Sequence, residues 1–136
     1  MFFKSLLTKL LTLLLVVFVG IFSFTSTSFA LTGNYTEDTL AVIQDLNKAI
    51  ALPNDADIET KKEIQINTRQ QINDYVSRYR KNSKYSGLKS FTTMQTALNS
   101  LAGYYTSYGN RPLPDTLKKR LDQEFKQVEF ALKKGY

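Results

Sequence analysis

The sequence contains no cysteine and no histidine. Without cysteine the chain can form no disulfide bond and no thiolate metal site, and it has no thiol nucleophile. Without histidine it lacks the commonest general base and the commonest metal ligand. No phosphate-binding loop, nucleophile elbow or metal-ligand spacing occurs in it either. These absences exclude most enzymatic chemistry, so we expect a protein that is not an enzyme and that holds neither a cofactor nor a metal.

The first 30 residues have the pattern of a cleavable secretory signal peptide. Lys4 and Lys9 supply the positive start, an apolar run follows, and a small-x-small cleavage site ends at Ala30. Cleavage there would leave one four-helix domain at residues 31–136. The alternative is an uncleaved membrane anchor, because residues 6–24 are nearly long enough to span a bilayer.

Four segments carry apolar residues at alternating gaps of three and four, which predicts amphipathic helices. We expect these helices at residues 36–52, 57–80, 91–108 and 114–134. Thr36 and Ser90 are the expected N-caps of the first and third helices, and Gly109 closes the third. Leu40 and Tyr108 belong to the expected core stripes. Since no segment alternates with period two, the short connections predict an all-α, up-down-up-down four-helix bundle.

The third predicted helix has a face without a single charged residue, opposite its apolar stripe. Charged residues make up roughly a quarter of an average chain, so about four would be expected among the residues of this whole helix, 91–108, which has none. Either neighbouring helices cover this face, or another protein binds to it. Tyr104 lies off the apolar stripe and favours a partner, because tyrosine is typical of interfaces. Tyr104, with Asn110 and Arg111 just beyond the helix, is therefore a candidate contact.

Cationic residues gather in two further places, although the chain's 18 basic against 12 acidic residues are too mild an excess to name a partner. Arg78 and Arg80 end the second predicted helix, and Lys118 and Arg120 lie near the start of the fourth. Solvated helix ends are the simplest explanation. An acidic protein surface or anionic lipid headgroups are the alternative. Export argues against nucleic acid, so we add these four residues to the candidate partner-binding set.

Nearly the whole predicted domain resembles the lumenal photosystem II assembly factor family called Psb-twenty-seven. The resemblance is carried by QINDYVSRYR at 71–80, GLKSFTTMQTALNSLAGYY at 87–105 and LKKRL at 117–121, with LTGNY at 31–35 matching the start of the mature region. It implies a monomeric four-helix bundle in the thylakoid lumen of cyanobacteria that is not an enzyme. It also implies binding to the lumenal loop of the inner antenna protein CP-forty-three in assembly and repair intermediates that lack the manganese cluster. There the family keeps extrinsic subunits off until maturation.

One departure from the family concerns lipid attachment. Cyanobacterial members commonly resemble lipoproteins with a lipid-bearing cysteine at the mature N-terminus, whereas this sequence has no cysteine. We therefore expect an unlipidated protein that is peripheral to the membrane through protein contact alone. The rival hypotheses are a permanent structural subunit of a thylakoid or periplasmic membrane complex and a helical protein that binds anionic lipid.

Overall fold

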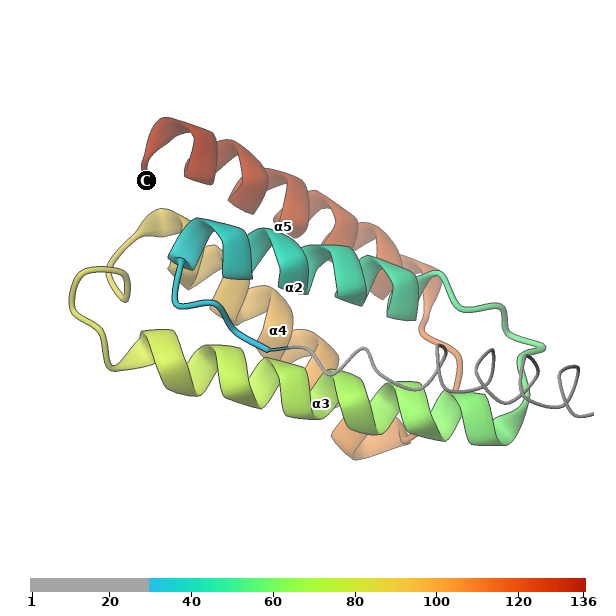
Figure 1. The fold of residues 1–136 in the computed structure, drawn as a ribbon. Coiled ribbons are helices and arrows are strands. Elements are labelled where there is room, and N and C mark those ends of the chain that lie inside the picture. Colours follow the sequence, from blue (N-terminus) through green and yellow to red (C-terminus); the bar gives the residue numbers. More distant parts are fainter. Residues whose placement is uncertain (1–29) are drawn as a thin grey trace, which may run out of the picture. The chain divides into compact units, whose positions relative to one another are not determined.

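The computed structural model describes residues 30–136, in which four helices account for most of the chain (Figure 1). They are α2 (Tyr35–Ile50), α3 (Ile58–Arg80), α4 (Lys89–Tyr108) and α5 (Asp115–Lys134). This part of the chain contains no strand, and the predicted all-α class is confirmed. None of its helices is long and apolar enough to cross a membrane. The predicted signal peptide lies outside the described residues except for Ala30, so its cleavage stays a prediction.

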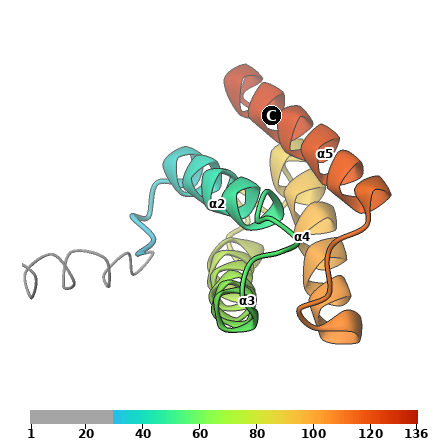
Figure 2. The same ribbon diagram turned by 90° about the vertical axis from the view of Figure 1, so that its right-hand side faces the viewer.

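Each helix runs opposite to the one before it, as the sequence predicted (Figure 1). Contacts join α2 to α3, α3 to α4, α4 to α5 and α5 back to α2, so the four helices form a closed ring (Figure 2). The stripes meet inside it, where the largest fully buried side chains are Tyr75, Tyr79, Phe91, Phe125, Ile43, Leu46, Met94, Leu98, Leu101, Leu121, Val42 and Val128. This topology brings the ends of α2 and α4 and the starts of α3 and α5 to one end of the bundle.

Two of the predicted helix caps are wrong. α2 begins at Tyr35, because the side chain of Asn34, not Thr36, accepts a hydrogen bond from the Glu37 amide at 3.0 Å. Ser90 lies inside α4, where it is buried and its hydroxyl forms a 2.7 Å hydrogen bond with that of Tyr35. The predicted helix end at Gly109 is confirmed: its φ of 62° lies in the region that glycine adopts most readily.

Two predicted core residues are exposed instead. Leu40 is 43% exposed, because the buried side of α2 starts with Asp38 and Thr39 and is therefore turned away from Leu40. Tyr108 is 52% exposed in the last turn of α4, where its ring lies against that of Tyr104. The polar residues that replace Leu40 in the core are hydrogen-bonded, as buried polar groups must be.

A buried polar network ties the chain before α2 to the far end of α3. The carboxylate of Asp38 accepts hydrogen bonds from the backbone and hydroxyl of Thr32, both at 2.8 Å, and from the Gly33 amide at 3.2 Å. It also accepts one from the hydroxyl of Tyr79. Burial and the adjacent carboxylate raise the pKa of Tyr79, so this hydroxyl stays protonated and remains a donor.

Candidate functional site

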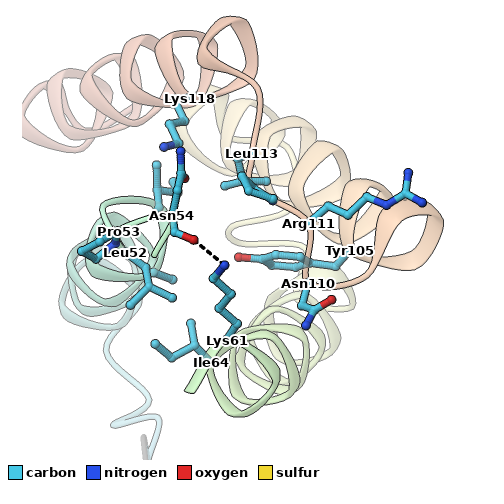
Figure 3. Close-up of a pocket in the computed structure, with 13 residues that line it drawn as sticks. Leu52, Pro53, Asn54, Lys61, Ile64, Tyr105, Asn110, Arg111, Leu113 and Lys118 are labelled. Atoms are coloured by element: carbon cyan, nitrogen blue, oxygen red, sulfur yellow. Dashed lines mark hydrogen bonds between the residues drawn. The ribbon is translucent and has the colours of Figure 1, made fainter. Parts of the chain in front are cut away.

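Two connectors meet at one end of the bundle and border a small pocket that is open to solvent, which we call the end cavity (Figure 3). One connector joins α2 to α3 and contributes Leu52, Pro53 and Asn54, and the other joins α4 to α5 and contributes residues 110–113. The cavity has a volume of about 40 Å³. Its walls combine aliphatic side chains with amide and cationic groups.

Tyr105, on α4, points its hydroxyl into the end cavity (Figure 3). The residue is only 7% exposed. Among the described residues its hydroxyl has no hydrogen-bond partner, whereas the backbone oxygen of Tyr105 accepts a 3.4 Å bond from Gln65. Burial raises the pKa of this phenol, so the group stays protonated and can donate a hydrogen bond.

Three cationic residues line the end cavity and no acidic residue does. Lys61 donates from its Nζ to the backbone oxygen of Asn54 at 2.5 Å, and its side chain lines the same cavity as Tyr105 (Figure 3). Lys118 enters from the first turn of α5, and the guanidinium of Arg111 extends outward from the rim. Lys61 was not among the predicted site residues, because a lysine in the first turns of a helix carries no signal of tertiary contact.

The structure brings four of the seven predicted partner contacts to this end. Asn110, Arg111 and Lys118 line the end cavity directly. Tyr104 lies beside it, half-buried, and its hydroxyl donates to the backbone oxygen of Pro112 at 2.7 Å. Tyr104 therefore holds the α4–α5 connector in place.

The other three predicted contacts lie elsewhere. Arg78 and Arg80 are exposed at the opposite end of α3, a helix of 23 residues that spans roughly 35 Å. Arg120 is exposed on α5 and pairs with Glu124 at 3.0 Å, one turn away. The Arg120 side chain is 54% exposed, so solvent screens the pair and its contribution to stability is small. The seven residues consequently do not form one site.

The charge-free face of α4 is open to solvent. Its exposed residues are Thr92, Thr96, Asn99, Gly103, Thr106 and Ser107. The interpretation that neighbouring helices cover this face is therefore wrong. Hydroxyls at positions 92, 96, 100 and 106 donate to backbone oxygens of their own helix at 2.9 to 3.2 Å. The result is a surface with few free donors and no charge, which we call the neutral α4 face.

Metal chemistry finds no support in the part of the chain that the structure describes. Within residues 30–136, no three acidic side chains gather as a metal site. Asp57, in an acidic stretch before α3, caps that helix by accepting from the Thr60 amide at 2.6 Å. The two candidate sites in the described residues are the end cavity and the neutral α4 face.

Fold and sites together define a small protein of the up-and-down four-helix-bundle class. The family model described as Photosystem II Pbs27 matches residues 4–132. The chain belongs to this family, and the predicted resemblance is confirmed.

Three relatives and one solved structure place the chain within the family. Photosystem II lipoprotein Psb27 of Synechocystis sp. is 57% identical over 134 residues, 98% of each chain. Photosystem II assembly factor lipoprotein Psb27 of Thermosynechococcus vestitus is 59% identical over 103 residues, 75% of each chain. Photosystem II repair protein PSB27-H1 of Arabidopsis thaliana is 33% identical over 106 residues, which cover 74% of this chain and 58% of that protein. The solution structure of Psb27 from cyanobacterial photosystem II shares 58% identity, with a TM-score of 0.74 over 82% of this chain and 96% of that chain.

The names of the two cyanobacterial relatives conflict with one expectation. Both are called lipoproteins, whereas we expected an unlipidated protein from the absence of cysteine. The comparisons do not support that expectation.

Proposed function

We propose that this chain is a non-catalytic assembly and repair factor of photosystem II. Support comes from relatives that cover most of the chain and whose names state photosystem II assembly or repair. The observation that carries the proposal is the identity of 57% over 98% of both chains. At that identity a shared fold and a shared kind of partner are the simplest explanation.

The proposed partner is the lumenal loop of the inner antenna protein CP-forty-three, in complexes that lack the manganese cluster. The neutral α4 face suits such a docking surface, because burying uncharged groups avoids the large desolvation cost of charges. Its hydroxyls already donate within the helix, so few donors would be left unsatisfied on binding. While bound, the bundle keeps extrinsic subunits off by occupying the surface they need.

The proposed location is the thylakoid lumen, to which the signal peptide directs the chain. There the protein would be attached to the membrane peripherally, through photosystem II. We propose a monomer that binds neither metal, cofactor nor nucleic acid.

Affinity capture from thylakoids tests this function. The tagged chain is expressed in place of the native copy, and the captured proteins are identified by mass spectrometry. We expect photosystem II core proteins that include CP-forty-three, with little manganese. Capture of a membrane complex other than photosystem II would contradict the proposal, and capture at constant stoichiometry from every photosystem II complex would indicate a permanent subunit.

A further inference from the structure

The end cavity contains a group whose hydrogen-bonding capacity is unused. Tyr105 is more than nine-tenths buried, and its hydroxyl points into the cavity without a partner among the described residues (Figure 3). A phenol hydroxyl at the wall of a pocket, with no acceptor from the protein, is free to donate to a bound ligand. The Tyr105 hydroxyl is therefore available to an acceptor that enters the cavity.

The charges around this hydroxyl favour an anionic acceptor. Lys61 and Lys118 are both half-buried, and neither pairs with an acidic residue in the described part of the chain. Neither ammonium group has a counter-charge there, so both lysines would attract a negative ligand. Asp55 and Asp115 lie at the same end of the bundle, but both are exposed and neither lines the cavity.

The size and walls of the cavity favour one class of anion. A volume of about 40 Å³ offers room for only a few atoms. Ile64, Leu113 and Leu52 form aliphatic walls beside the polar groups. A short aliphatic chain that ends in two oxygens fits this combination, whereas a tetrahedral anion would bring four oxygens against apolar surface.

We propose that the end cavity is a socket for the carboxylate of a glutamate or aspartate side chain of the partner protein. The Tyr105 hydroxyl donates to one carboxylate oxygen, the ammonium groups of Lys61 and Lys118 neutralise the charge, and the aliphatic walls pack against the methylene groups of the side chain. Arg111, on the rim, attracts the acidic segment before it docks. This proposal rests on the proposed function, since it names the chemistry by which the partner is recognised.

The test uses propionate, which carries the aliphatic carboxylate of a glutamate side chain, and propionamide, its neutral counterpart. Each is titrated into ¹⁵N-labelled protein at constant ionic strength while amide chemical shifts are followed. We expect saturable shifts at Lys61, Tyr105 and Leu113 with propionate and none with propionamide. Equal responses to the two compounds, or a stronger response to inorganic phosphate, would overturn the proposal.

Variants assign the effect to the cavity. Tyr105→Phe removes only the hydroxyl, and we expect it to weaken propionate binding about tenfold, as loss of a hydrogen bond to a charged group does. Lys61→Gln should also weaken it, whereas Lys62→Gln, at the exposed neighbouring position, should leave it unchanged. Full propionate binding in Lys61→Gln contradicts the socket.

Two blocked peptides distinguish the source of the carboxylate. We expect acetyl-Ala-Glu-Ala-amide to bind and acetyl-Ala-Gln-Ala-amide not to bind. A third peptide, acetyl-Ala-Gln-Ala, has a free C-terminal carboxylate and no acidic side chain. Binding of this peptide alone would overturn the assignment to a side chain. These titrations contain no photosystem II. If they fail, the carboxylate socket is wrong but capture from thylakoids can still support the proposed function. If capture fails, the proposed function is wrong but the titrations can still show that the cavity binds a carboxylate.

Discussion

Asp38 shows how a single residue connects the start of the bundle to its core. Burial alone would raise its pKa, but hydrogen bonds from Tyr79, Thr32 and Gly33 outweigh burial and hold the pKa below its ordinary value. Ionisation of Asp38 is therefore more favourable in the folded state than in the unfolded state. This stabilisation is present above the unfolded pKa of about 4 and is lost as the pH falls toward the lower folded pKa.

Replacing this carboxylate tests its contribution. Asp38→Asn places an amide NH₂ where hydrogen-bond donors already converge, so we expect the free energy of unfolding at pH 7 to fall by about 2–3 kcal/mol. Urea denaturation measures it. The difference from the natural protein should shrink below pH 4, because a protonated Asp38 loses the same interactions.

Asp45→Asn is the matched control, since Asp45 is half-buried and accepts only one hydrogen bond, from Gln71 at 2.9 Å. We expect a smaller loss of stability there. A deficit in Asp38→Asn that is the same at pH 3 and pH 7 would contradict the role given to the ionised carboxylate.

The residue scale is also where the sequence was least informative. An acidic residue in a first helical turn, such as Asp38, is ordinary beside the helix dipole, and the donors to Asp38 lie 5, 6 and 41 residues away in sequence. The sequence also did not predict that Lys61 and Tyr105 line the same cavity, because one is an ordinary helix cation and the other an ordinary core aromatic. Only the meeting of the two connectors brings these residues into one cavity.

At the scale of elements, apolar spacing predicted the four helices well. Spacing reports which side of a helix is apolar, but it assumes that buried positions are apolar. Asp38 and Thr39 break that assumption in α2 and displaced the predicted stripe onto Leu40. Whether the neutral α4 face was covered or open could not be read from α4 alone, because it depends on where α3 and α5 pack.

The end of α4 depends on Gly109, whose φ of 62° and ψ of −130° suit glycine. Gly109→Ala should lower the free energy of unfolding by about 1–3 kcal/mol, measured by urea denaturation. Gly87→Ala is the control, because Gly87 has no positive φ and open space surrounds its Cβ position. We expect that variant to be neutral or slightly stabilised. Equal losses in both variants would show that chain strain at Gly109 is not the cause.

The neutral α4 face makes a prediction about binding. Thr96→Glu places a charge in its middle, and we expect capture of photosystem II core proteins to drop at least about tenfold, because the charge would be buried without a partner. Glutamate is a good helix former, so the thermal unfolding temperature should hardly change.

Gln127→Glu, at an exposed position of α5, carries the same charge change and should leave capture intact. If both variants are captured as well as the natural protein, the neutral α4 face is not the docking surface.

For the whole molecule, attachment to the membrane is the first question. Intact mass spectrometry of the protein isolated from its own thylakoids measures both cleavage and lipid at once. A mass equal to that of residues 31–136 alone would support protein contact as the attachment. A mass increased by acyl chains would contradict protein contact as the attachment and agree with the names of the cyanobacterial relatives.

The central claim is that this bundle occupies photosystem II only while the complex is incomplete. The most direct measurement is the ratio of this chain to photosystem II core protein in two fractions, one oxygen-evolving and one lacking manganese. We predict a ratio near one in the fraction that lacks manganese and a ratio near zero in the oxygen-evolving fraction. Equal ratios, or enrichment in oxygen-evolving complexes, would contradict the claim.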